Sequence, residues 1–88
     1  MKSWFRLYAE VVDDPKVQKL SAELFKAWVN FMCLTARNNG RFISVSDTAF
    51  GLRISEDNAR FILTELTTLG LLEMNAKSLM YRPHNWTG

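Results

Sequence analysis

Apolar residues recur every three or four positions between residues 22 and 38, which is the spacing of one face of an α-helix. A helix that is apolar around much of its circumference is either central to a fold or faces a partner. Ser21 is a suitable N-cap before it, and the run Asn-Asn-Gly at 38–40 favours a left-handed C-cap. The pattern therefore predicts one long central helix. Its two adjacent apolar stripes are Leu24, Trp28, Phe31 and Thr35, and Phe25, Val29, Met32 and Ala36.

A short helix is predicted before the central one. Asp13 and Asp14 precede Pro15, and an acidic residue followed by proline at the first helical position is a helix-start signal. This helix spans only residues 15–20, because Ser21 opens the next.

Two helices joined by a tight turn are predicted after the central helix. Ser46 is expected to cap the first, which ends near residue 52, and the turn follows at 53–54. Ser55 is expected to cap the second, over residues 56–69. The expected buried stripe of this second helix is Ala59, Ile62, Leu63, Leu66 and Leu69.

The last part of the chain predicts a β-hairpin. Gly70 supplies a helix stop, and two short runs at 71–74 and 79–82 flank a polar turn at 75–78. Residues 41–44 are predicted to form a short extended link between the central helix and the helix pair.

The order of these elements indicates a fold that is mainly α with a small β-hairpin, the winged helix-turn-helix. In such domains the helix after the tight turn can enter the DNA major groove, and the hairpin wing can reach the backbone or minor groove. The major groove is about 12 Å wide and admits an α-helix. Residues 1–88 are expected to form one such domain.

The composition supports a folded domain and leaves the class of partner open. The 88 residues are 48% apolar, with 3 Trp, 6 Phe and only 2 Pro, which excludes a disordered chain. The formal net charge of +2 is a mild basic excess that does not separate DNA binding from protein binding.

Cysteine usage and hydropathy indicate the cytoplasm. Cys33 is the one cysteine and cannot form an internal disulfide, which points to a reducing compartment. Charged residues interrupt the N-terminal region, so no signal peptide is expected. The most apolar stretch, 27–36, is too short to span a membrane.

Polar and basic residues on the predicted helix pair and hairpin are the candidate DNA contacts. Arg60 can pair with guanine or phosphate, and Asn58 with adenine or phosphate. Arg53 in the turn and Lys77 at the wing tip are placed for backbone contacts. Each cation alone is equally consistent with a solvated surface charge. The predicted DNA-binding residues are Arg41, Arg53, Asn58, Arg60, Thr64, Lys77 and Arg82.

Two acidic residues oppose this assignment. Glu56 and Asp57 lie at the start of the same predicted helix, where they stabilise it through the helix dipole but would repel a phosphate.

The sequence offers no catalytic or metal-binding constellation. His84 is the only histidine, and with Cys33 it cannot assemble a zinc site or a paired nucleophile. Trp28, Phe31 and Met32 have the spacing of core residues rather than of a ligand pocket. We therefore expect no enzyme activity and no cofactor.

Several segments of the chain resemble the N-terminal winged-helix domain of phage and prophage replication proteins, the DnaD-like replisome organisers and initiators. The resemblance covers essentially the whole chain. The segments that carry it are 4–8 (Trp-Phe-Arg-Leu-Tyr), 13–17 (Asp-Asp-Pro-Lys-Val), 20–21 (Leu-Ser), 66–72 (Leu-Thr-Thr-Leu-Gly-Leu-Leu) and 81–86 (Tyr-Arg-Pro-His-Asn-Trp).

The resemblance implies a domain that binds double-stranded DNA or assembles with itself at the start of replication in a bacterial cytoplasm. It also implies that this domain is the N-terminal part of a longer protein. A homodimer and other replication proteins are the further partners that it suggests.

A protein-interaction module and a transcriptional regulator of the same fold remain open as alternatives. The broadly apolar helix at 22–38, together with Trp4, Phe5 and Tyr8, presents more apolar surface than a small core is expected to absorb. Trp86 is expected to pack back on the domain.

Overall fold

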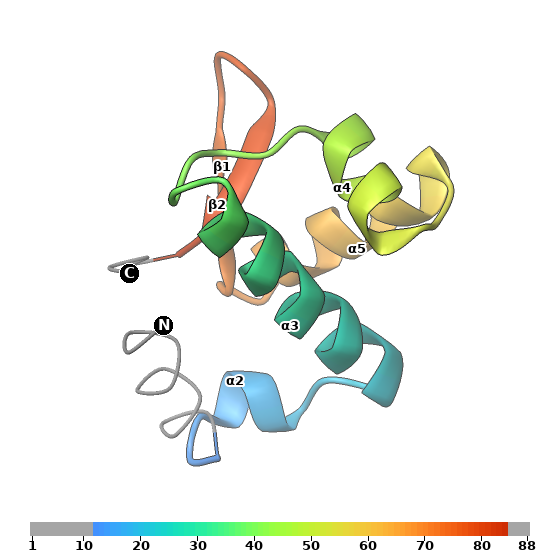
Figure 1. Cartoon of the computed structure of the whole chain (residues 1–88). Coiled ribbons are helices and arrows are strands. Elements are labelled where there is room, and N and C mark those ends of the chain that lie inside the picture. The colour runs from blue at the N-terminus through green and yellow to red at the C-terminus, as the bar shows by residue number, and fades with distance from the viewer. Residues whose placement is uncertain (1–11, 85–88) are drawn as a thin grey trace.

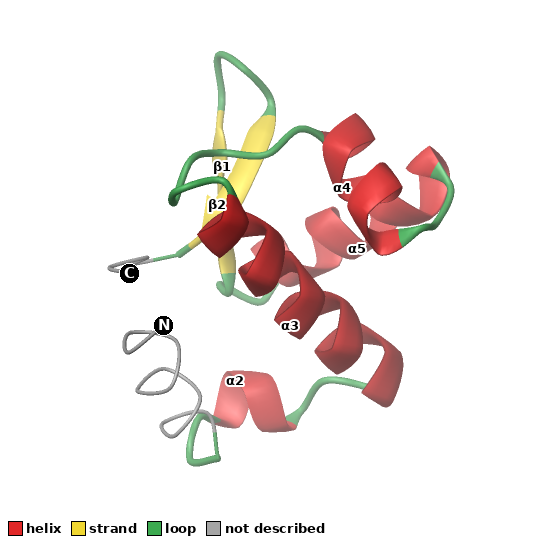
Figure 2. Cartoon of the chain, viewed as in Figure 1, coloured by secondary structure: helices red, strands yellow, loops and turns green. Residues whose placement is uncertain are grey.

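Helix α3 crosses the middle of the computed structural model, which describes residues 12–84 (Figure 1). The described part is mainly helical with a small two-stranded antiparallel sheet, an arrangement compatible with a winged helix (Figure 2). The expectations for Trp4, Phe5, Tyr8 and Trp86 concern residues outside this range. The elements are α2 (Pro15–Gln18), α3 (Ala22–Arg37), α4 (Val45–Leu52), α5 (Glu56–Thr68), β1 (Leu72–Asn75) and β2 (Met80–Pro83).

Three helices begin at the capping residues that the sequence predicts. Asp14, Ser21 and Ser55 precede α2, α3 and α5, and each has extended backbone and a side-chain oxygen that accepts a backbone N–H. The donor–acceptor distances are 2.9, 3.2 and 3.1 Å. These bonds satisfy N–H groups that the first helical turn leaves without a partner.

The predicted cap of α4 is wrong by two residues. Ser44 is the N-cap, and its Oγ accepts the backbone N–H three residues further on at 3.0 Å. Ser46 lies inside the first turn, where its hydroxyl donates to Glu56 Oε2 at 3.0 Å. The reason is tertiary: Ile43 pairs with Tyr81 as an antiparallel bridge, so the extended chain is held up to residue 43 and the helix begins directly after it.

The helix ends follow the glycine and asparagine signals. Asn39 and Gly40 have φ values of 60° and 78° after α3, and Gly70 has a φ of 82° after α5. Glycine adopts this left-handed conformation without the steric penalty that a Cβ brings. The predicted stops after both helices are confirmed.

The hairpin forms as predicted, with each strand one residue later than expected. Residues 72–75 pair with residues 80–83 in antiparallel register. In the turn, the Asn75 carboxamide oxygen accepts the backbone N–H groups of Lys77 and Ser78 at 2.9 and 3.2 Å. This local bonding is characteristic of asparagine at the start of a turn.

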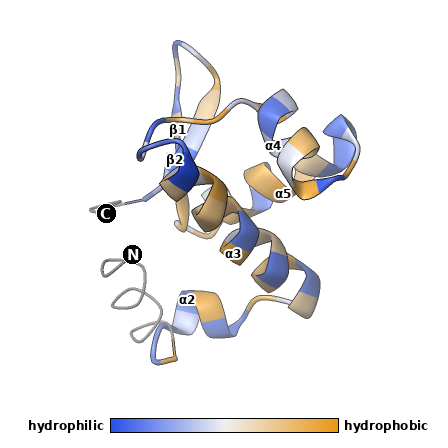
Figure 3. Ribbon diagram, in the orientation of Figure 1, coloured by the Kyte–Doolittle hydropathy of each residue, from blue (hydrophilic) through white to orange (hydrophobic). Residues whose placement is uncertain are grey.

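One continuous core joins α2, α3, α5, the link and the hairpin. Trp28, Phe31 and Met32 lie within it, as their spacing predicts. Hydrophobic and hydrophilic residues interleave along α3 and α5, so each helix has a buried and an exposed side (Figure 3). The buried members of the core are Val17, Trp28, Phe31, Met32, Ile43, Leu63, Leu66, Leu71, Leu72 and Tyr81.

The predicted buried stripe of α5 is partly wrong. Ala59, Leu63 and Leu66 are fully buried, and Ile62 packs at the edge of the core. Leu69 is 39% exposed, because α5 ends at Thr68 and the chain turns at Leu69 toward the hairpin.

Among residues 12–84, no helix combines the length and the apolar content that crossing a bilayer requires.

Candidate nucleic-acid interface

The α4–turn–α5 unit is fixed by hydrogen bonds at the turn. Arg53 adopts a left-handed conformation, with φ 59° and ψ 48°, and C-caps α4. Directly after it, the Ile54 N–H donates to the Ala49 carbonyl at 3.0 Å. The Ser46–Glu56 hydrogen bond joins the first turns of the two helices. The side chain of Arg53 is therefore carried on a defined backbone just before α5 begins.

All three predicted DNA contacts on α5 are exposed: Asn58, Arg60 and Thr64. Glu65 is half-buried on the flank of the helix. The opposite side of the helix carries the buried Leu63 and Leu66. The exposed residues of α5 include Asn58, Arg60, Phe61, Thr64 and Thr68.

The acidic residues at the start of α5 have partners. Arg60 Nη1 lies 3.6 Å from Asp57 Oδ1, and both side chains are largely exposed. An exposed pair of this kind contributes little stability, so the Arg60 guanidinium can exchange it for another anion. Glu56 accepts the hydroxyl of Ser46.

Three predicted DNA-contacting cations are exposed and form no ion pair within the described residues: Arg41, Arg53 and Lys77. Arg53 lies in the turn before α5, and Lys77 lies at the tip of the hairpin. Arg41 precedes Ile43, which pairs with Tyr81, so the antiparallel register places it toward the open end of the hairpin. The structure thus separates Arg41 from the hairpin tip.

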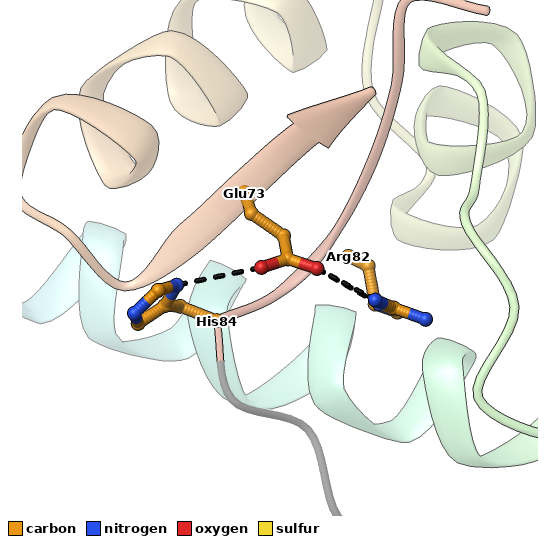
Figure 4. Close-up of polar contacts among 3 residues, drawn as sticks. All are labelled: Glu73, Arg82 and His84. Carbon is orange, nitrogen blue, oxygen red and sulfur yellow. Dashed lines mark hydrogen bonds and ion pairs between the residues drawn. The ribbon is translucent and has the colours of Figure 1, made fainter.

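Arg82 differs from these three cations because Glu73 engages it directly across the hairpin (Figure 4). The Nη2 and Nε atoms of Arg82 both donate to Glu73 Oε2, at 2.6 and 3.2 Å. The guanidinium also lies over the Phe42 ring, 4.3 Å from its centroid. Arg82 therefore connects the link to both strands, and the carboxylate of Glu73 compensates its charge.

His84 completes the cluster around Glu73. Its Nδ1 lies 3.4 Å from Glu73 Oε1, on the other oxygen of the carboxylate (Figure 4). The hydrogen bond from Arg82 lowers the pKa of Glu73, and His84 adds to that effect, while partial burial opposes it.

Asn58 lines a groove of about 540 Å³ between α3 and the α4–turn–α5 unit. Polar residues such as Glu23 and Lys26 line this groove together with apolar ones. Phe61 also lines the groove and is 62% exposed. The apolar lining residues are Leu24, Ala27, Leu52, Ile54, Phe61 and Ile62.

Two features of this surface were not predicted from the sequence: the partners of Arg82, and the exposure of Phe50, which is 88% exposed on α4. The cross-strand pair of Glu73 and Arg82 follows from the hairpin register, so a correct register would have identified it. Phe50 lies one position after the buried Ala49, on the opposite side of a short helix. The helical periodicity of α4 was the available signal.

Within the described range, no cluster of three His, Cys, Asp or Glu side chains is arranged to hold a metal ion. Cys33 lies in the second half of α3, with its side chain exposed.

Comparison with known proteins finds no matching family model, no matching curated protein and no matching solved structure. The resemblance to phage replication proteins therefore stays a prediction from the sequence.

Proposed function

We propose that this chain is a DNA-binding winged-helix domain of a phage-type replication initiator or organiser. The observation that carries the proposal is the placement of two unpaired cations, with Arg53 in the turn before α5 and Lys77 at the tip of the hairpin. Helix α5 serves as the recognition helix and the β1–β2 hairpin as the wing. In Figure 1, α4, α5 and the hairpin tip occupy the upper part of the molecule, and α2 the lower part.

In the proposed complex, the cations and the polar side chains of α5 have different tasks. Arg53 and Lys77 contact phosphates and set the position of the domain on the duplex. Arg60 exchanges Asp57 for a phosphate or a guanine edge, and Asn58 and Thr64 face the major groove of the DNA. Arg82 keeps the wing in shape through Glu73 and Phe42 rather than serving as a free phosphate contact.

The proposal predicts salt-dependent binding that relies on Arg53 and Lys77. Binding to a labelled generic duplex is followed by fluorescence anisotropy at three salt concentrations. The logarithm of the binding constant plotted against the logarithm of the salt concentration should have a slope of about −2 to −4. The double variant Arg53→Ala/Lys77→Ala should reduce the magnitude of that slope by about 2, because each phosphate contact contributes about 1.

The double variant Lys16→Ala/Lys19→Ala is the matched control, because it removes the same charge from α2 and the residue that follows it. It should leave the slope nearly unchanged. An equal loss in the two double variants would show that net charge alone drives binding. Absence of binding at about 50 mM salt would remove the DNA-binding function from this domain.

A protein-interaction or dimerisation module is the second candidate function. Phe50 and Phe61 are 88% and 62% exposed, and large exposed aromatic side chains are enriched at protein interfaces. Sedimentation at micromolar concentration tests the homodimer, which Phe50→Ser should dissociate. A transcriptional regulator of the same fold would use the surfaces proposed here on a different target site.

A further inference from the structure

Phe61, Thr64 and Thr68 form a stripe along the exposed side of α5. Their spacings of three and four residues place them one above another on the helix surface. All three are exposed, Phe61 to 62%. This line is the part of α5 directed away from the buried Leu63 and Leu66.

The chemistry of the stripe is mainly that of apolar carbon. It presents one phenyl ring and two threonine side chains, each with a methyl and a hydroxyl group, and it contains no lysine, arginine, asparagine or glutamine. In the major groove, the C5 methyl of thymine is the feature that phenylalanine and threonine methyl groups contact, whereas the other base edges present hydrogen-bonding groups. The stripe therefore matches the thymine methyl group of the major groove rather than its hydrogen-bonding groups.

Cations on the segments before and after α5 favour a polyanion as the occupant of the stripe. On α5 itself Arg60 pairs with Asp57, and Glu56 accepts the Ser46 hydroxyl and keeps its negative charge. Arg53 and Lys77 remain without ion pairs among the described residues, at the turn before α5 and at the hairpin tip. An apolar line on a helix that lies between two such cations along the chain fits the methyl groups of a major groove whose edges are phosphates.

We propose that Phe61, Thr64 and Thr68 recognise thymine methyl groups, so that the domain prefers major grooves rich in A·T pairs. This inference rests on the proposed function, because it requires α5 to enter the major groove. Phe61 supplies the largest apolar contact, and the threonine methyl groups extend it along the helix.

The test compares two short labelled duplexes of the same mixed A·T-rich sequence, one with thymine and one with uracil at every such position. Uracil keeps the base pairing and the phosphates and lacks only the C5 methyl. Burial of one methyl-sized group corresponds to about a fourfold change in affinity, so the wild-type protein should bind the uracil duplex more weakly by about fourfold for each methyl contacted.

Phe61→Ala should weaken binding to the thymine duplex and reduce the difference between the two duplexes. Phe50→Ala removes an even more exposed phenyl ring from α4 and should keep the difference. Both rings are exposed, so circular dichroism and thermal unfolding of the two variants should match the wild type.

Equal wild-type affinity for the two duplexes would overturn the inference, and the proposed function would stand if Arg53→Ala/Lys77→Ala still weakened that binding. Loss of the thymine preference in Phe50→Ala would also overturn it. Absence of binding to both duplexes would remove the proposed function and the inference together. If Phe61→Ala instead dissociates a micromolar dimer and leaves the duplexes equal, the stripe is a protein interface.

Discussion

Ser44 and Ser46 show how residues of one type, two positions apart, take different roles. Both have the hydroxyl that an N-cap needs, yet only Ser44 has the extended backbone, with φ −75° and ψ 164°, that a cap requires. Ser46 is already helical and uses its hydroxyl on Glu56. The bridge between Ile43 and Tyr81 decides between the two serines.

Ser44→Ala should lower the free energy of unfolding by about 1 kcal/mol, because an N–H in the first turn of α4 loses its acceptor. Ser46→Ala should cost less, since its hydrogen bond to Glu56 is exposed to water. Urea denaturation of both variants measures the difference. A larger loss for Ser46→Ala would contradict the assignment of the cap.

Arg53 and Arg82 illustrate the same point for the candidate site. In the sequence both are basic residues near predicted turns and strands. In the structure Arg53 is exposed without an ion pair among the described residues, whereas Arg82 donates to Glu73 and lies over Phe42. Of these two arginines, only Arg53 has a charge that is free to bind an external anion.

At the scale of elements, the hairpin depends on one cross-strand pair as well as on its backbone ladder. Glu73 and Arg82 are directly opposed in register, and about a third of each side chain is exposed. The Phe42 ring beneath the guanidinium extends this contact to the link that precedes α4. The proposed wing is therefore attached to the rest of the molecule near its base as well as through the end of α5.

Acid should remove the contribution of this pair. The pKa of Glu73 in the folded state lies below its ordinary value, so its charged form stabilises the fold at neutral pH, and that stabilisation is lost as the pH falls through the lowered pKa. Glu73→Gln should therefore be less stable than the wild type at about pH 7, by less than about 1 kcal/mol, with the gap closing at about pH 3.

Thermal unfolding of the wild type and Glu73→Gln at both pH values measures this gap. Asp13→Asn removes an exposed carboxylate outside the helices and provides a comparison for the general effect of acid. A stability gap between the wild type and Glu73→Gln that is constant with pH, or that widens in acid, would show that the charge of Glu73 is not what stabilises the hairpin.

For the whole molecule, a small shared core fixes the helices and the hairpin relative to one another. Leu63 and Leu66 on α5 are fully buried against residues from α3, the link and the hairpin. A chain of 88 residues buries a limited fraction of its surface, so each core side chain accounts for a large share of the stability.

Leu63→Ala should lower the free energy of unfolding by about 3 kcal/mol, because it removes buried carbon and leaves a cavity. Thr64→Ala, at the next position and on the exposed side, should change it by less than about 0.5 kcal/mol. Urea denaturation followed by circular dichroism compares the two. Similar losses at both positions would mean that α5 is oriented differently from the structure described.

The sequence alone determined the features that depend on interactions within about four residues. The caps at Asp14, Ser21 and Ser55, the stop at Gly70 and the amphipathic α3 were predicted because helix caps and apolar stripes are local properties of the chain. The hairpin was found to within one residue because its polar turn, where the Asn75 carboxamide accepts nearby backbone N–H groups, is also a local signal.

Tertiary structure decided the features that depend on partners from distant segments. It chose Ser44 over Ser46, exposed Leu69, and paired Arg82 with Glu73 while leaving Arg53 without an ion pair among the described residues. The cap at Ser44 and the partner of Arg82 follow from the strand register, and the exposure of Leu69 follows from where the chain leaves α5 for the hairpin. The spacing of residue types along the chain did not fix that register.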